Sequence, residues 1–160
     1  MSHAQINLRY DTVEKIYPRD EALKWGREIE VYTQIPWATP QLMWWGDCWL
    51  EMERCLPILE LGPEASVKYR QPLRDLLQKV HEAGYWHRDI DLVNVVVHPT
   101  RGVLIIDWEN MCRSSGDVSY DLYGARTAGV KPAWFGKKGP DGQFWHGWSK
   151  TSPDNYWRGL

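Results

Sequence analysis

The first residues of the chain alternate between apolar and polar side chains, a pattern typical of β-strands. Residues 6–10 alternate in this way, and Val13, Lys15 and Tyr17 share one face with the same period of two. Pro18 has no backbone N–H to continue a strand ladder, so it ends the run. The pattern predicts one or two short strands, with Lys15 on the same face as Val13 and Tyr17.

A helix is predicted next, because the apolar spacing changes after Asp20. Apolar residues recur at positions 22, 25, 29 and 32, which places them on one helical stripe. Asp20 is suited to the N-cap position, where its carboxylate can accept a backbone hydrogen bond. Glu28 borders the stripe and can therefore point at whatever the helix packs against.

Two further strands are predicted over residues 41–45 and 48–53, with a turn at Gly46–Asp47. The stretch RCLPILELGPE follows, and its two prolines and one glycine make it the one convincing boundary between lobes. We therefore expect a first lobe over residues 1–54 and a connector over residues 55–62.

A core-facing helix is predicted after the connector, beginning near Pro72, since proline suits the first helical position. Its buried face follows the i, i+3, i+4, i+7, i+8 spacing through Leu73, Leu76, Leu77, Val80 and His81. Gly84 is the expected stop. Because His81 lies on this apolar face, we expect it to pack in the core rather than to bind a ligand.

The stretch NVVVHPTRGVLIID predicts a β-hairpin, because two β-branched runs flank a proline- and glycine-containing turn. If Val97 pairs with Val103, then Asn94 pairs with Ile106. Asn94 and Asp107 therefore leave the hairpin at the same open end. Asp89 precedes Asn94 by five residues, on the loop that enters the hairpin.

Composition and charge fit one domain of 160 residues, with 43% apolar and 25% charged residues. The net charge of −2 gives no basic footprint, so no nucleic-acid partner is expected. The three cysteines show no metal-type spacing and are expected to be reduced thiols without a zinc site. No run approaches the length of a membrane span and the N-terminus lacks a signal-peptide core, so a cytoplasmic location is expected.

The last part of the chain is expected to hold a third helix over residues 116–129 and an aromatic-rich tail over residues 131–160. The tail contains glycine, proline, lysine and four of the eleven tryptophans, which favours loops packed by aromatic rings. Such a tail would either cover the lower part of the fold or offer a docking surface to a partner protein.

The polar residues around the hairpin suit one kind of chemistry. Magnesium prefers oxygen ligands, and an aspartate together with an asparagine amide supplies them. Phosphoryl transfer also needs a carboxylate that can orient the acceptor hydroxyl and accept its proton. Asn94 and Asp107 fit the first requirement and Asp89 fits the second.

HRDIDLVN, at residues 87–94, resembles the catalytic loop H-R-D-x-x-x-x-N of protein kinases and their relatives. The spacing from this loop to IIDWE is also similar to that family. The resemblance implies that Asp89 is the catalytic base and that Asn94 and Asp107 bind magnesium, with Asp107 as the main ligand. It gives His87 and Arg88 structural roles in the loop.

The sequence DWE at Asp107–Glu109, followed by SGDVSYDLYG, looks like the aminoglycoside phosphotransferase and choline kinase branch. In that branch a Gly-Asp-x-x-x-Asp-Leu stretch opens a helix beneath the catalytic loop. The resemblance implies that Asp121 braces the backbone of the loop.

The resemblance extends upstream and covers residues 12–128. Lys15 is similar to the lysine that contacts the α- and β-phosphates of the donor, and Glu28 looks like its helix partner, with Glu30 as a weaker candidate. The stretch WLEMERC looks like the hinge strand that binds adenine through backbone groups, near Glu53 and Cys55.

The sequence also departs from the family. Residues 1–14 contain no glycine, so the usual phosphate-binding loop is missing, and the first hairpin is expected to be shortened or absent. Asp91 stands two residues after Asp89, where serine/threonine kinases place a lysine. The segment from Asp107 to Asp121 is short and lacks the usual peptide-docking platform.

We therefore expect an α+β protein with a small two-lobed, protein kinase-like fold that has a truncated N-lobe sheet and a reduced helical C-lobe. One domain would comprise the N-lobe, the hinge, a catalytic C-lobe over residues 63–130 and the tail. The expected function is a kinase that uses ATP and Mg²⁺ to phosphorylate a hydroxyl of a protein or small molecule. The alternative is an inactive pseudokinase that binds a partner protein.

Overall fold

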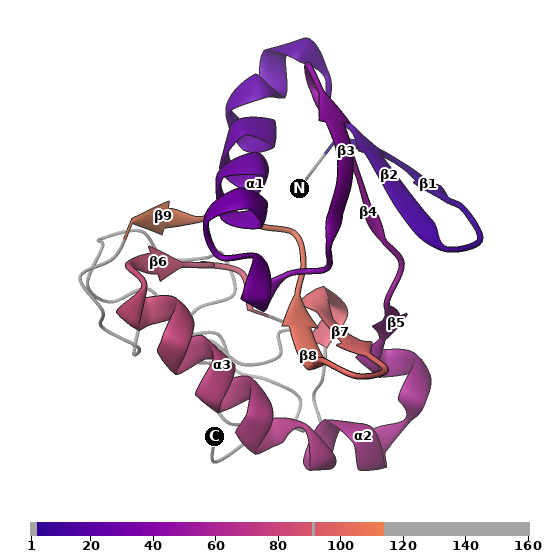
Figure 1. Cartoon of the computed structure of the whole chain (residues 1–160), viewed down its shortest axis with the longest axis vertical. Helices are drawn as coiled ribbons and strands as arrows, with labels where there is room; N and C mark the ends of the chain where they lie inside the picture. Colours follow the sequence, from indigo (N-terminus) through magenta and orange to yellow (C-terminus); the bar gives the residue numbers. More distant parts are fainter. Residues whose placement is uncertain (1–2, 91, 114–160) are drawn as a thin grey trace, which may run out of the picture.

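The computed structural model describes residues 3–90 and 92–113 (Figure 1). Its strands are β1 (Gln5–Leu8), β2 (Thr12–Ile16), β3 (Leu42–Gly46), β4 (Trp49–Glu53), β5 (Leu56–Pro57), β6 (Tyr85–Trp86), β7 (Val95–His98), β8 (Gly102–Ile105) and β9 (Cys112–Arg113). Its helices are α1 (Ala22–Gln34), α2 (Pro63–Lys68) and α3 (Arg70–Glu82), with short 3-10 turns η1 (Arg19–Glu21), η2 (Pro36–Ala38), η3 (Ile58–Leu61) and η4 (Leu92–Asn94). The described chain is therefore mixed α and β.

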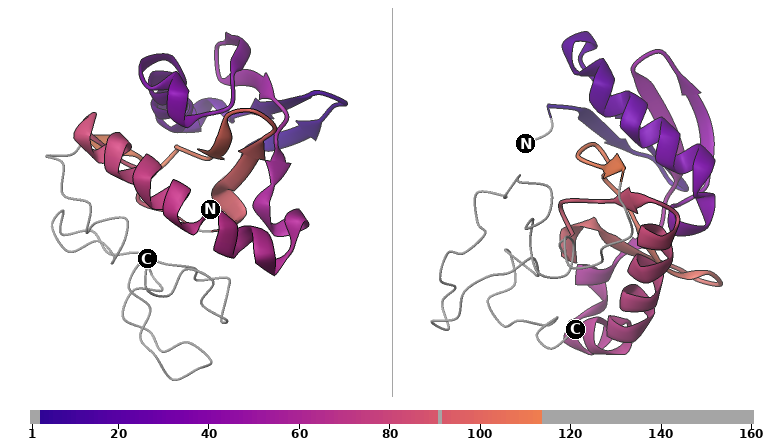
Figure 2. Two further views of the ribbon diagram at one scale, coloured as in Figure 1. Left: turned by 60° about the horizontal axis from the view of Figure 1, so that its bottom comes forward. Right: turned by 90° about the vertical axis from the view of Figure 1, so that its left-hand side faces the viewer.

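The largest sheet is antiparallel, with the strand order β1-β2-β4-β3. Helix α1 packs on it, since Trp25 Nε1 donates to Trp49 O at 3.1 Å and the Tyr32 hydroxyl lies 3.0 Å from Met52 Sδ. In Figures 1 and 2, this sheet and α1 lie on one side of the molecule and α2, α3 and the β7–β8 hairpin on the other. One hydrophobic core joins the two sides.

The first strands form a hairpin, so of the two alternatives, a shortened or an absent first hairpin, absence is wrong. Residues of β1 pair with β2 from Gln5 opposite Ile16 to Leu8 opposite Val13. The predicted face is confirmed, because Lys15 is 5% exposed and Tyr17 is 3% exposed.

Helix α1 differs from its prediction at its start and on its buried face. Asp20 lies within η1 and is not the N-cap; the N-cap of α1 is Glu21, which makes no side-chain capping hydrogen bond. Glu28 is fully buried beside Val31 and Tyr32, at the centre of the packed face rather than at its border. The apolar pattern placed the face correctly within one position but could not show a buried carboxylate at its centre.

The connector contains more regular structure than the sequence predicted. Strand β5 and turn η3 lie within it, and Gly62, with a positive φ of 85°, separates η3 from helix α2, which follows the connector. Helix α3 then begins at Arg70, two residues before Pro72. Its buried face is confirmed at Leu73, Leu77, Val80 and His81, and Gly84 follows the helix with a φ of 91°.

The β7–β8 hairpin has the predicted register. Val97 pairs with Val103, and the N–H of Ile106 donates to Asn94 O at 3.0 Å. The two ends of the hairpin therefore bring Asn94 next to the residue before Asp107. Strand β5 pairs with the other edge of β7 and completes a three-stranded sheet.

The third predicted helix, Asp121 and the tail over 131–160 lie outside the described residues, as does Asp91. The kinase-type division into lobes stays a prediction. Within residues 3–90 and 92–113, every helix is too short or too polar to cross a membrane.

Candidate functional site

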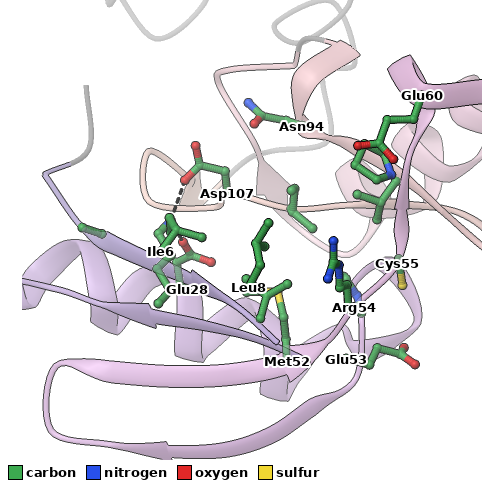
Figure 3. A pocket seen from close by; sticks show the side chains of 17 residues that line it. Ile6, Leu8, Glu28, Met52, Glu53, Arg54, Cys55, Glu60, Asn94 and Asp107 are labelled. Atoms are coloured by element: carbon green, nitrogen blue, oxygen red, sulfur yellow. Dashed lines mark hydrogen bonds and ion pairs between the residues drawn. The ribbon is translucent and has the colours of Figure 1, made fainter. Parts of the chain in front are cut away.

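A cavity of about 380 Å³ lies between the four-stranded sheet and the open end of the β7–β8 hairpin (Figure 3). Its apolar lining includes Ile6, Leu8, Val13, Met52, Val96 and Ile106. Its polar lining includes Lys15, Glu28, Glu53, Glu60, Asn94 and Asp107. Five of the seven predicted site residues are in these two sets and a sixth, Cys55, also lines the cavity, whereas Asp89 is not among its described lining residues.

Lys15 joins two carboxylates that are far apart in the sequence. Its Nζ donates to Glu28 Oε1 and, at 2.7 Å, to Asp107 Oδ1. Burial alone would lower the pKa of Lys15, but the charges of Glu28 and Asp107 outweigh burial and raise that pKa above its ordinary value. Lys15 is therefore a fixed cation, and its pairing with Glu28 agrees with the predicted partner.

Glu30, the weaker candidate for that partner, is used elsewhere. Its Oε1 accepts a hydrogen bond from Arg113 Nη2 in β9. The guanidinium of Arg113 also lies over the Tyr85 ring, 4.6 Å from its centroid. Glu30 thus ties α1 to the segment after Asp107 rather than to Lys15.

Asn94 and Asp107 lie at the same end of the cavity, as the hairpin register predicts (Figure 3). Asn94 is 6% exposed, and its Nδ2 donates to Asp89 O at 2.9 Å. This hydrogen bond fixes the amide plane and leaves Oδ1 as the free side of the amide for a ligand. Asp107 has a φ of 65°, in the left-handed region.

The loop at residues 87–94 is held from below by His87, which is fully buried. Its Nε2 lies 2.9 Å from Ile106 O, and its Nδ1 accepts the N–H of Asp89 at 3.2 Å. The ring also meets Trp108 edge to face, with centroids 4.6 Å apart. His87 therefore links the backbone of Asp89 to the strand that leads into Asp107, a structural contact.

Arg88 contacts the segment after Asp107 rather than the cavity. Its Nε donates to Asn110 O at 2.6 Å, and its φ is 70°. Asp89, the next residue, is half-buried, and its backbone carbonyl is the acceptor for Asn94. The loop is thus bonded to Asn94 through the carbonyl of Asp89 and to the segment beyond Asp107 through Arg88.

The predicted hinge lines the cavity through Glu53, Arg54 and Cys55. The carboxylate of Glu53 is bound away from the cavity, by Arg101 Nη1 at 3.1 Å and His98 Nε2 at 3.4 Å. The N–H groups of Glu53 and Arg54 donate to Gln41 O and Asp11 O, so within the described chain only the N–H of Cys55 remains among these three. Burial and the nearby Glu53 raise the pKa of Cys55 to about 11, which keeps its thiol protonated near neutral pH.

Two residues of the site were not singled out from the sequence. Glu109 is 3% exposed, with Oε2 at 3.8 Å from Lys15 Nζ and 3.4 Å from the Tyr17 hydroxyl. The Tyr17 hydroxyl donates to Glu28 Oε1 at 2.6 Å, and burial together with Glu28 raises the pKa of Tyr17. The strand pattern placed Tyr17 on the same face as Lys15, and this was the sequence signal that could have identified it. For Glu109 the only sequence signal was its position in the DWE motif.

The charge around Lys15 is predominantly negative. Carboxylate oxygens of Glu28, Asp107 and Glu109 lie within 4.8 Å of one another, and Lys15 is the cation among them. Three carboxylates therefore surround one ammonium group. Together with the amide oxygen of Asn94, this cluster offers the hard oxygen ligands that Mg²⁺ prefers.

No protein-family model matches the sequence, and no curated protein matches it. Among solved structures, the fold matches WbdD, described as a bifunctional kinase-methyltransferase, with a TM-score of 0.56 over 69% of this chain. The two sequences are 20% identical, and the chain spans 30% of that WbdD chain. The likeness is one of fold: this chain is folded like a part of a kinase-methyltransferase.

Proposed function

We propose that the protein is a phosphotransferase that uses ATP and Mg²⁺ to transfer the γ-phosphoryl group to a hydroxyl of a protein or small molecule. The observation that carries this proposal is the contact of Lys15 with Asp107 at the cavity end that also holds Asn94. A fixed cation and two oxygen ligands in one cavity are what a magnesium-bound triphosphate requires. The likeness in fold to WbdD, which is described as a kinase-methyltransferase, supports the same proposal.

The donor phosphates would meet Lys15, which Glu28 holds in place. Asp107 and Asn94 would hold the magnesium, and bound magnesium supplies positive charge that offsets the charge of the phosphates. The Lys15 ammonium and the Asp107 carboxylate are already adjacent at 2.7 Å, so little rearrangement is needed to orient both toward one triphosphate.

The adenine base of ATP would occupy the apolar part of the cavity. Leu8 and Val13 come from the sheet and Val96 and Ile106 from the hairpin, so apolar side chains of two elements face each other across it. A volume of about 380 Å³ is large enough for a small ligand. The N–H of Cys55 would donate to the ring edge, because the N–H groups before it are already bonded.

Asp89 would orient the acceptor hydroxyl and accept its proton. It is half-buried and its backbone is fixed by His87 and Asn94. Because it stands outside the lining of the cavity, the acceptor would approach from the loop side rather than through the base pocket.

The direct test is phosphate transfer or ATP turnover with labelled ATP and magnesium, in the wild-type chain and in Asp107→Ala. We expect the substitution to lower turnover by about two orders of magnitude or more, because it removes the main metal ligand. Asp20→Ala is the matched control, since Asp20 is an exposed aspartate of η1. Equal turnover by wild type and Asp107→Ala would refute the proposal.

An inactive nucleotide- or partner-binding pseudokinase is the second candidate, and one observation favours it. The β1–β2 turn at residues 9–11 has no glycine and is fastened to the hinge, with Arg54 Nη1 donating to Arg9 O at 2.7 Å. Such a turn offers phosphates fewer backbone N–H groups than a glycine-rich loop does. Unfolding measured with and without MgATP separates the candidates: ligand at a hundred times its dissociation constant adds about 2.7 kcal/mol, and such binding without turnover would support the pseudokinase.

A further inference from the structure

We propose that Arg27 is a positioning residue: by holding the carbonyl oxygen of Glu109 it fixes Asp107 against Lys15 and so strengthens the binding of a magnesium-bound nucleotide. The inference rests on the proposed phosphotransferase function. Arg27 precedes Glu28 on α1, and its Nη1 donates to Glu109 O at 3.1 Å.

Asp107 needs such support because its φ of 65° is disfavoured for a residue with a Cβ. A conformation of this kind persists only where the surrounding structure fixes it. The chain before Asp107 is fixed by the contact of His87 Nε2 with Ile106 O at 2.9 Å. The chain after it is fixed by Trp108, which is fully buried and donates through Nε1 to Ile105 O at 2.9 Å.

Two guanidinium groups then hold consecutive carbonyl groups of the same turn. Arg27 reaches Glu109 O from helix α1, and Arg88 reaches Asn110 O from the catalytic loop at 2.6 Å. The N–H of Met111 donates back to Trp108 O at 3.0 Å and closes the turn. The turn after Asp107 is therefore attached to α1, which carries Glu28, and to the loop that carries Asp89 and Asn94.

Helix α1 consequently sets both members of the Lys15–Asp107 pair. Glu28 orients the lysine directly, and Arg27, the adjacent residue, orients the turn that carries the aspartate. Without Arg27, α1 would still hold Lys15, but the turn that carries Asp107 would lose one of its anchors and Asp107 would be positioned less firmly. Metal ligands that lose such outer support bind less tightly because their geometry is no longer preorganised.

The test compares the dissociation constants of MgATP and of ATP in EDTA by calorimetry. Arg27→Met removes the donor but keeps an apolar stem, and Arg19→Met is the matched control on η1, where Arg19 pairs only with the exposed Asp47 among the described residues. We expect Arg27→Met to weaken MgATP binding about tenfold, or about 1.4 kcal/mol, with little change for ATP in EDTA. Hydrogen exchange of the Met111 amide in the nucleotide-free protein is expected to become faster in Arg27→Met and to stay unchanged in Arg19→Met.

A lower melting temperature with an unchanged ratio of the two dissociation constants would assign Arg27 a structural role only and overturn the inference. If Arg27→Met does not fold, Arg27→Gln is measured instead and judged by the same ratio of dissociation constants. Glutamine also removes the guanidinium group but keeps a polar side chain. A wild-type chain that binds nucleotide in neither condition overturns the proposed function and this inference together. A wild-type chain that binds MgATP, with an Arg27 variant that binds it equally well, overturns this inference alone.

Discussion

Lys15 buries its ammonium group between the carboxylates of Glu28 and Asp107, and only 6% of its side chain is exposed. An unpaired ammonium ion in such a place would cost several kcal/mol, whereas a paired and hydrogen-bonded one is tolerated. At the scale of the residue, the site is thus a set of charges that depend on one another. Removing Lys15 would leave the buried carboxylate of Glu28 without its cation.

Replacing Lys15 by methionine should destabilise the protein as well as weaken nucleotide binding. Glu28 is fully buried and would lose its cationic partner, so we expect the free energy of unfolding to fall by about 3 kcal/mol. Urea denaturation measures this change. Arg19→Met, which removes an exposed ion pair with Asp47, should leave the free energy nearly unchanged; equal effects of both substitutions would contradict the account.

High pH should weaken the folded state through the same cluster. The pKa values of Lys15 and Tyr17 are both raised in the folded protein. Groups of this kind contribute stability fully below their unfolded pKa values, which are about 10, and that contribution is lost as pH rises above them. Urea titrations at increasing pH should show the loss in wild type and a smaller loss in the double variant Lys15→Met, Tyr17→Phe; identical slopes would contradict it.

The sequence predicted the main residues of the site but not all of their partners. Strand periodicity placed Lys15 on one face, and hairpin register brought Asn94 and Asp107 together; both are local properties. The roles of these residues came from the resemblance to kinases and stay predictions. Glu109 could not be assigned in that way, because its contacts with Lys15 and Tyr17 depend on how α1 and the sheet pack against the later segment. Glu53 was placed at the cavity correctly, yet the direction of its carboxylate depends on Arg101, nearly fifty residues away.

At the scale of the element, the β1–β2 hairpin covers one side of the cavity with apolar side chains. Ile6 and Leu8 line the cavity although they are 50% and 63% exposed, so ligand binding would bury them further. Arg54 fastens the turn of the hairpin to the hinge. The hairpin therefore forms an apolar wall of the cavity, and its turn is held by Arg54.

The double substitution Ile6→Ser, Leu8→Ser should weaken nucleotide binding by roughly thirtyfold, since each apolar side chain buried by a ligand contributes on the order of 1 kcal/mol. The melting temperature of the free protein should change little, because both side chains are already largely exposed. Calorimetry with MgATP measures the first effect. Leu23→Ser is the control, as Leu23 is 79% exposed on α1; a similar loss of affinity there would count against the apolar wall.

Short elements explain most of the differences between prediction and fold. Strand β5 has two residues and α2 has six, too few for either period to be recognised in an isolated sequence. The β7–β8 hairpin and α3 were predicted well because their β-branched runs and heptad-like spacing persist over several residues. The early start of α3 follows from its close succession to α2, which the proline at position 72 concealed.

At the scale of the whole molecule, Arg101 connects the two sides of the fold. From the β7–β8 turn its Nη2 donates to Pro36 O at 2.8 Å and to Thr39 O at 2.9 Å, and its Nη1 donates to Glu53. One side chain thus joins the hairpin to both the segment after α1 and the hinge. Arg101 therefore holds the β7–β8 turn against the segment after α1 and against Glu53 at the end of β4.

Arg101→Ala should lower the free energy of unfolding by about 2 kcal/mol, because it removes a charged donor from two carbonyl groups and from the Glu53 carboxylate. Arg101→Lys keeps the charge but cannot reach all three acceptors, so an intermediate loss is expected. Chemical denaturation followed by circular dichroism measures both. Full stability of Arg101→Ala would show that the two sides are held together by the shared core alone.

If the cavity binds a nucleotide as proposed, the crowding of Glu28, Asp107 and Glu109 around a single ammonium group has a consequence for the form of nucleotide that it accepts. A triphosphate without a bound cation would meet excess negative potential at its charged end and would bind more weakly. The same molecule in its chelated form brings the missing positive charge with it. The pocket would therefore discriminate between the two forms by electrostatics alone, and surplus unchelated nucleotide would be a poor inhibitor.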